Sequence, residues 1–172
     1  MKIFVETPRL ILRELLDTDD EGMFELDSNA EVLKYLYTEP HTKIEQSRDV
    51  IAFIRKQYEE NGIGRWAVIE KQSGAFIGWA GLKLVKQTIN NRTNYYDVGY
   101  RLIPCYWGRG YATEVSKASI DYGFNTLKLN LICATASMHN IASRKVLEKT
   151  GLTFIEKFLY DGEPEAWYEI MK

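Results

Sequence analysis

A strand pattern runs directly into two glycines and then into a helix pattern in the second half of this chain. Residues 97 to 103 are typical of a strand, Gly108 and Gly110 follow, and apolar residues recur at helical spacing from about 110 to 124. Glycines at such a junction leave backbone N–H groups unshielded, and the positive end of the helix dipole adds to them. The junction predicts either an anion-binding turn or only a tight turn, which glycine also permits.

The other segments predict further strands and helices in a definite order. Thr42 to Glu45 fits a capping box that starts a helix ending at Gly62, and Asp161-Gly162 suits a hairpin turn. We predict strands at 8–13, 65–69, 75–85, 97–103, 129–136, 153–160 and 166–171, and helices after 17–21 and at 42–62, 110–124 and 140–150. This order predicts an α/β fold in which helices pack on a mixed sheet, as one domain over residues 1–172.

Composition excludes several classes of protein. With 45% hydrophobic and 27% charged residues, the chain has the balance of a globular domain, and no run of about 18 apolar residues occurs. We therefore expect no signal peptide, no membrane span and a cytoplasmic location. The net charge of -2, with acids and bases interspersed, argues against a nucleic-acid partner. Two cysteines and two histidines predict neither a disulfide scaffold nor a metal site.

Two familiar phosphate motifs do not account for the glycines. A P-loop requires Gly-Lys followed by Ser or Thr, which this turn lacks. A dinucleotide fingerprint requires a third glycine where this chain has Thr113. The turn therefore points to neither a nucleoside triphosphate nor a nicotinamide cofactor.

Four stretches, in order, resemble the GNAT N-acetyltransferase superfamily, in particular the branch of ribosomal-protein-alanine N-acetyltransferases. They are Thr7-Pro-Arg-Leu-Ile-Leu-Arg13, Asp97-Val-Gly-Tyr100, Tyr106-Trp-Gly-Arg-Gly-Tyr-Ala-Thr-Glu114 and Asn140-Ile-Ala-Ser-Arg-Lys-Val-Leu-Glu-Lys-Thr-Gly151. Cys105 departs from the superfamily, which usually has Gln or Arg at that position. The resemblance implies a mixed, mostly antiparallel sheet that is splayed at its centre and flanked by about four helices.

The resemblance also implies where acetyl-coenzyme A would bind. Its pyrophosphate would be held by the backbone amides of Gly108, Arg109, Gly110, Tyr111 and Ala112. Its pantetheine arm would pair with the strand at 97–103 through Leu102 and Ile103, where that strand parts from the strand at 129–136. No metal is implied.

The helix at 140–150 offers two candidate site residues. Asn140 is a candidate for hydrogen bonding to the pantetheine arm, and it also suits the N-cap of the helix. Many superfamily members have a tyrosine eight positions into this motif that protonates the departing thiolate, but this chain has Leu147. Ser143, one turn after Asn140, is the best replacement, although a helix serine can also be merely tolerated.

Asp97 matches an acidic position of the branch at the start of its strand. It could accept a proton from the amine through water, or it could be a solvated acid at a strand end. The aromatic residues Tyr100, Tyr106 and Trp107 are expected to pack. A covalent role for Cys105 would need an activating base that the sequence does not identify, so direct attack by the amine is preferred.

Together these features predict an acetyl-coenzyme A-dependent N-acetyltransferase. The alternative is a non-catalytic acyl-coenzyme A-binding or interaction module on the same fold, because a fold does not determine a function. The acceptor is open among a protein N-terminus, an amino acid, a polyamine and an aminoglycoside, and the chain is expected to be a monomer or a homodimer.

Overall fold

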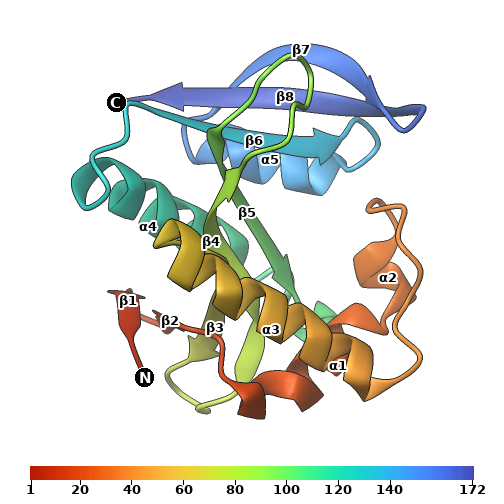
Figure 1. The fold of residues 1–172 in the computed structure, drawn as a ribbon, viewed down its shortest axis with the longest axis vertical. Helices are drawn as coiled ribbons and strands as arrows, with labels where there is room; N and C mark the ends of the chain where they lie inside the picture. The colour runs from red at the N-terminus through yellow and green to blue at the C-terminus, as the bar shows by residue number, and fades with distance from the viewer.

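The computed structural model describes residues 1–172 and arranges their strands in one eight-stranded sheet (Figure 1). The order across the sheet is β1-β2-β3-β4-β5-β6-β8-β7, so β8 lies between β6 and β7. The strands are β1 (Ile3–Glu6), β2 (Leu10–Arg13), β3 (Trp66–Glu70), β4 (Phe76–Val85), β5 (Tyr95–Leu102), β6 (Leu131–Ser137), β7 (Thr153–Tyr160) and β8 (Glu163–Met171).

Helices cover both faces of this sheet. They are η1 (Asp17–Asp19), α1 (Asp20–Asp27), α2 (Ala30–Leu33), α3 (Ile44–Asn61), η2 (Pro104–Tyr106), α4 (Tyr111–Asn125) and α5 (Ile141–Lys149). Met23 of α1 and Ile54 of α3 belong to the core on one face, whereas Val115 of α4 and Leu147 of α5 belong to the core on the other. Figure 1 shows α3 in front of β4 and β5, with α5 behind β6. None of these helices has the length and apolar character that crossing a membrane requires.

The two halves of the sheet meet at a narrow joint. β5 and β6 are parallel and share one register pair, Asp97 with Cys133, whereas the other neighbouring strands are antiparallel. Beyond Asp97, towards Leu102, β5 stays paired with β4 and leaves β6. The predicted α/β fold with a mixed, mostly antiparallel sheet is confirmed, and the divergence of β5 and β6 is called the splay below.

The start of α3 differs from the sequence prediction. Gln46 Oε1 accepts the backbone N–H of Thr42 at 2.8 Å and that of Lys43 at 3.0 Å. The capping box predicted between Thr42 and Glu45 is therefore wrong, because the residue after Glu45 satisfies the free amides. The predicted end is confirmed, since Gly62 has a φ of 70° and caps the helix.

Short elements account for most other differences. The sequence did not predict β1 or α2, because four residues are too few to show a period of either kind. The prediction for β7 agrees with its observed bounds, Thr153–Tyr160. The hairpin after it is confirmed too, since Asp161 and Gly162 have φ values of 49° and 83°, as its turn type requires.

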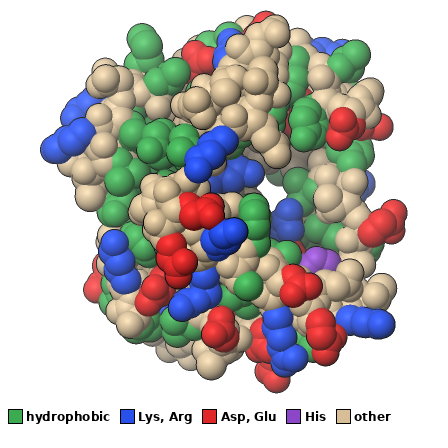
Figure 2. Space-filling model, viewed as in Figure 1, with side chains coloured by type: hydrophobic (Ala, Val, Ile, Leu, Met, Phe, Trp, Pro, Cys, Tyr) green, Lys and Arg blue, Asp and Glu red, His purple; other side chains and the backbone are tan.

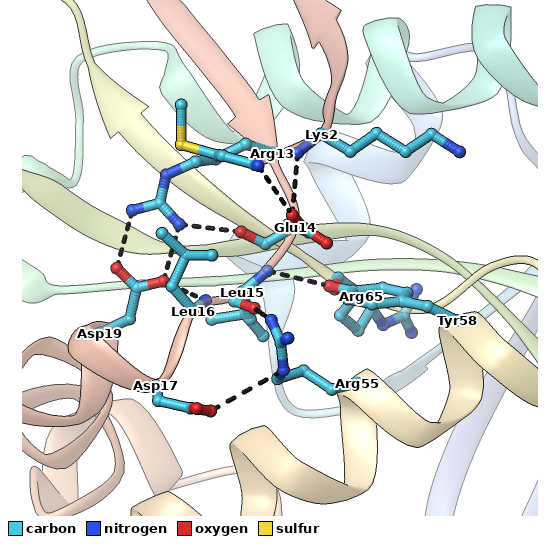
Figure 3. Close-up of polar contacts among 11 residues, drawn as sticks. Lys2, Arg13, Glu14, Leu15, Leu16, Asp17, Asp19, Arg55, Tyr58 and Arg65 are labelled. Atoms are coloured by element: carbon cyan, nitrogen blue, oxygen red, sulfur yellow. Dashed lines mark hydrogen bonds and ion pairs between the residues drawn. The ribbon is translucent and has the colours of Figure 1, made fainter.

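A polar network ties the end of β2 to η1, α3 and the entry of β3 (Figure 3). Arg13 donates to both carboxylate oxygens of Asp19 at 2.7 Å. The Tyr58 hydroxyl accepts the Leu15 N–H at 3.2 Å and donates to the Arg65 carbonyl. Burial raises the pKa of Tyr58 to about 12, so the phenol remains a neutral donor. The network thereby positions Arg65, whose side chain pairs with Asp97 of β5.

Gly123 lets α4 lie close to the sheet, which gives the first prediction. A Cβ there would lie 2.6 Å from Ile132 Cδ1 and 2.9 Å from Leu82 Cδ1. We expect Gly123→Val to lower the free energy of unfolding in urea by about 1–3 kcal/mol, because overpacking forces core side chains from their rotamers. Asp121→Val, on the exposed side of α4, is the control and should change stability little. Equal stability of Gly123→Val and the parent would contradict this packing.

Candidate active site

The two glycines form an open turn between β5 and α4. Gly108 and Gly110 have φ values of 72° and 81°, in the left-handed region that favours glycine. A Cβ on Gly108 would meet nothing within 4 Å, and one on Gly110 would reach only the Arg9 guanidinium at 3.5 Å. The first N–H groups of α4, which begins at Tyr111, have no intrahelical acceptor. The turn therefore presents an uncovered, positively polarised wall on which an anion fits.

A brace from the turn between β1 and β2 holds the glycine turn. Thr7 Oγ1 donates to Glu114 Oε1 at 2.6 Å, and Arg9 Nε donates to Glu114 Oε2 at 2.7 Å. Arg9 Nη1 also donates to the Arg109 carbonyl at 2.9 Å, which lies inside the turn. We call these contacts the Thr7–Arg9–Glu114 brace. They make the first strand motif and the glycine motif one structural unit.

Tyr111, the first residue of α4, is fastened on two sides. Its hydroxyl donates to Glu70 Oε1 at 2.6 Å, and this hydrogen bond raises the pKa of the phenol. The Arg9 guanidinium lies 4.4 Å from the centre of the Tyr111 ring. A pocket of about 310 Å³ adjoins this contact and is lined by Pro8, Arg9, Glu70, Lys71, Gln72 and Tyr111. The start of α4 is therefore held by Arg9, just before β2, and by Glu70 at the end of β3.

At the end of β5, backbone groups point alternately towards β4 and towards the splay. Ile103 N–H donates to the Ile77 carbonyl at 2.9 Å, so the Ile103 amide serves the β4 side. Trp107 Nε1 donates to the Leu102 carbonyl at 2.7 Å. Because successive residues of a strand direct their backbone groups to opposite sides, Tyr100 and Leu102 face the splay. Of the two residues predicted to meet the pantetheine, Leu102 faces the splay and Ile103 does not offer its amide there.

The first turn of α5 approaches β5 across the splay. Asn140 caps the helix, and its Oδ1 accepts the Ser143 N–H at 3.1 Å. Burial raises the pKa of Tyr100, and a hydrogen bond with the Ser143 side chain opposes that rise. Leu147 is buried in the main core. Ser143 and Tyr100 thus bring two hydroxyls together, although Tyr100 was expected only to pack.

Asp97 lies at the joint of the sheet and not at the start of a strand. It is buried, and its Oδ2 pairs with Arg65 Nη2. Arg65 Nη1 donates to the Asp97 carbonyl at 2.7 Å and also to the Gly81 carbonyl. Gly99 makes room for the guanidinium, because a Cβ there would lie 2.7 Å from Arg65 Nη2. The alternative of a solvated strand-end acid is therefore wrong.

A hollow lies on the face of the sheet opposite α5. Figure 2 shows it between β5, the β6–β8 pair and the segment around α2, with Lys or Arg side chains at its edge. Glu165 of β8 lies directly opposite Ser137 of β6, whose Oγ is 3.2 Å from the Tyr37 hydroxyl. Burial raises the pKa of Glu165 to about 7, and Glu163 adds to this rise. We call this depression the front hollow.

Sequence reasoning assigned no role to several of these residues. Thr7, Arg9 and Glu114 lie in the motifs that carry the resemblance, which was the one available signal for their brace. Arg65 was predicted only as a strand residue, and nothing in the sequence distinguishes Glu165 from a surface acid. The structure contains no cluster of three or more His, Cys, Asp or Glu side chains that could hold a metal ion.

Comparisons with known proteins agree with this geometry. A family model described as the acetyltransferase (GNAT) domain matches residues 9–153. The uncharacterised N-acetyltransferase YoaA of Bacillus subtilis is 35% identical over 147 residues, which are 86% of this chain and 81% of that protein. FsC-acetyl coenzyme A-N(2)-transacetylase of Aspergillus fumigatus is 32% identical over 166 residues, 93% of this chain and 70% of that protein. The crystal structure of ribosomal-protein-S5-alanine acetyltransferase from Vibrio fischeri shares the fold, with a TM-score of 0.78 at 19% identity over 97% of this chain and 95% of that chain.

The brace gives a prediction about pH. Burial alone would raise the pKa of Glu114, but hydrogen bonds from Thr7 and Arg9 outweigh it and hold that pKa below its ordinary value. A depressed carboxyl pKa stabilises the fold above the unfolded value and loses this contribution as pH falls. We therefore expect Glu114→Gln to cost about 1–3 kcal/mol at pH 7 in urea unfolding.

The difference between the parent and Glu114→Gln should shrink as pH falls below about 4.5, where the unfolded carboxyl takes up its proton. Glu59→Gln, at an exposed position of α3, is the control and should leave stability unchanged. A difference that stays constant from pH 7 to about pH 3 would refute the role of this charge.

Proposed function

Because the chain belongs to the GNAT family of acetyltransferases, we propose that it moves the acetyl group of acetyl-coenzyme A to a primary amine by direct attack in a ternary complex. The amine belongs to a small molecule or to a protein N-terminus. Relatives named as an N-acetyltransferase and a transacetylase support an enzyme over a binding module on the same fold.

The observation that carries this proposal is the open glycine turn at the mouth of the splay. In the proposed complex, the pyrophosphate accepts hydrogen bonds from the backbone amides that the resemblance indicates, those of Gly108, Arg109, Gly110, Tyr111 and Ala112. The open space around the Cβ position of Gly108, and the single contact at 3.5 Å with the Arg9 guanidinium at Gly110, support this fit. The exposed Arg109 side chain adds a positive charge at the same place.

The pantetheine arm is proposed to lie in the splay as an extended chain. The Leu102 N–H and the backbone of Tyr100 face it from β5, because β6 does not pair with them there. Asn140 Oδ1 already accepts the Ser143 N–H, so the Asn140 side-chain NH₂ remains to donate to the arm. When bound, acetyl-coenzyme A supplies a thioester carbonyl that an amine can attack.

Ser143 is the proposed proton donor. As the new C–N bond forms and the C–S bond breaks, the departing sulfur requires a proton. The Ser143 hydroxyl contacts Tyr100, whose phenol remains protonated because burial raises its pKa. Leu147 cannot serve, since it is apolar and buried. Ser143 would therefore pass its proton to the thiolate and recover one through Tyr100.

Glu165 is the proposed proton acceptor. The amine must lose a proton to attack, and a base whose pKa lies near the working pH does this best. Glu165 has a pKa of about 7 and faces the front hollow, on the opposite side of the sheet from Ser143. Asp97, predicted for this task, has its carboxylate engaged by Arg65. A catalytic role for Asp97 stays a prediction, and its ion pair favours a role in positioning Arg65.

The glycine turn supplies the direct test of this function. Asparagine tolerates the left-handed conformation, so Gly110→Asn should keep the turn while its side chain fills the cradle. We expect a rise of about tenfold or more in KM for acetyl-coenzyme A, because roughly 1.4 kcal/mol of lost binding is tenfold. Titration calorimetry of acetyl-coenzyme A checks the loss of affinity independently of turnover.

The matched control is Gly62→Asn, which has a φ of 70° and no atoms within 4 Å of its Cβ position. It should bind acetyl-coenzyme A as the parent does. If millimolar acetyl-coenzyme A neither binds nor stabilises the parent, the proposed function is wrong. Unchanged affinity in a folded Gly110→Asn would remove the glycine turn from the proposal.

The proposed base predicts a pH profile. Because Glu165 must be ionised to accept a proton, kcat/KM of the parent should rise with pH to a plateau above about pH 7. Glu165→Gln should lose this rise and about a hundredfold or more in rate. Glu163→Gln should keep the rate and shift the rise to lower pH, because Glu163 raises the pKa of its neighbour. An unaltered profile in Glu165→Gln would exclude this base.

A further inference from the structure

Three basic side chains gather on the sheet face that borders the front hollow. Lys83 of β4 lies directly opposite Asp97 of β5, and Arg101 of β5 lies opposite Trp79. The guanidinium groups of Arg65 and Arg101 lie 5.3 and 5.1 Å from the centre of the Trp79 ring. These three cations therefore share one patch on the sheet, which we call the basic floor.

The carboxylates beside the basic floor do not balance it. Asp97 pairs with Arg65, and Asp27 Oδ1 accepts from Arg101 Nη1 at 2.5 Å. Lys83 has no carboxylate within ion-pair distance, and Arg101 Nε is buried without any hydrogen-bond partner. Three cations thus face two carboxylates, and the positive charge of Lys83 is left without an ion-pair partner.

This excess charge is costly in a site that is partly shielded from water. Burial lowers the pKa of Lys83, repulsion from Arg65 and Arg101 lowers it further, and Asp97 opposes the fall. An uncompensated cation in such surroundings destabilises a fold unless an anion joins it. The structure therefore carries a binding surface for an anion that the protein itself does not provide.

The basic floor faces the direction from which an acceptor would approach. α4 and α5 cover the other face of the sheet, and Figure 1 shows β4 and β5 extending above α3 with no helix in front of them. Figure 2 shows basic side chains at the edge of the same hollow. A molecule whose amine reaches the splay through the front hollow would place its remaining groups over this floor.

We propose that the acceptor is a small primary amine that also carries an oxyanion, a carboxylate or a phosphate, held by the partly exposed ammonium of Lys83. This inference rests on the proposed function and names its substrate class. An ammonium donates charge-assisted hydrogen bonds to such oxygens. A diamine or polyamine would instead bring a second cation to a positive surface, which costs binding free energy.

The test uses primary amines of matched length that differ in their far end. For two to four methylenes, one series ends in a carboxylate, one in a phosphate, one in an uncharged amide and one in a second ammonium. Acetylation is followed by thiol release and by the mass of the product. We expect kcat/KM for a carboxylate or phosphate amine to exceed that of its amide and diamine at least about tenfold, a difference of roughly 1.4 kcal/mol.

The amide is the critical comparison, because its weaker basicity gives it more free amine at neutral pH. A preference for the anion therefore cannot come from the amine itself. The better of the carboxylate and phosphate series identifies the anion. An enzyme that acetylates the diamines or amides as well as the anionic amines overturns this inference and leaves the proposed function standing. Failure to bind acetyl-coenzyme A or to acetylate any amine overturns both.

Variants of Lys83 test whether this residue causes the preference for anionic amines. Lys83→Gln should reduce the preference for the anionic amine over its amide to near unity, while KM for acetyl-coenzyme A stays as in the parent. Lys83→Arg should retain the preference, and Lys86→Gln, an exposed lysine just beyond β4, should not alter it. A raised melting temperature in Lys83→Gln would show that the variant folds and that the charge of Lys83 destabilises the protein when no anion is bound. An unchanged preference in Lys83→Gln overturns the inference.

Discussion

The buried ion pair between Arg65 and Asp97 lies where the two halves of the sheet are joined by a single register pair between β5 and β6. Arg65 precedes β3, donates to a carbonyl of β4 and to one of β5, and pairs with the carboxylate of the residue that alone registers with β6. Removing one partner of a buried ion pair typically costs about 3–5 kcal/mol, because the other charge stays buried and unpaired. The glycine at position 99 gives the guanidinium its place against the sheet. The splay begins at this contact, so every proposed cofactor contact on β5 depends on it.

The splay also separates two kinds of chemistry. The helices α4 and α5 cover one face of the sheet, and α5 brings Ser143 to Tyr100 there. The other face stays open around the front hollow and carries Glu165 and the basic floor. An extended cosubstrate between β5 and β6 would touch both faces. In the proposed complex, the division of the sheet into two halves would put the proposed proton donor Ser143 and the proposed acceptor Glu165 on opposite sides of the reacting bond.

Local signals in the sequence predicted the fold well, and contacts between distant segments explain what they missed. Gly62, the glycine turn and the bounds of β7 follow from turn residues and from period, which neighbouring residues determine. The start of α3 was displaced because Gln46 competes with Glu45 for the same free amides, and sequence cannot rank two such neighbours. Asp97 was predicted to accept a proton and Ile103 to meet the pantetheine, because their observed partners, Arg65 and Ile77, lie far away in the chain. The charge of the basic floor is likewise a property of four segments that meet only after folding.

The order of the strands determines when each strand can pair during synthesis of the chain. β8 follows β7 in sequence but lies between β6 and β7 in the sheet, so β7 has no sheet partner until β8 has been made. A nascent chain emerging from the ribosome can form the β1–β2 hairpin and the β3–β4–β5 meander locally and pair β2 with β3 once residues 14–65 have been made, whereas the second half of the sheet must wait for residues 163–171. Until then, both edges of β7 present unpaired backbone N–H and C=O groups, which can pair wrongly with other chains. The strand that carries Glu165 is therefore placed last, and an unfinished chain would hold the proposed phosphate-binding turn before it holds the proposed base.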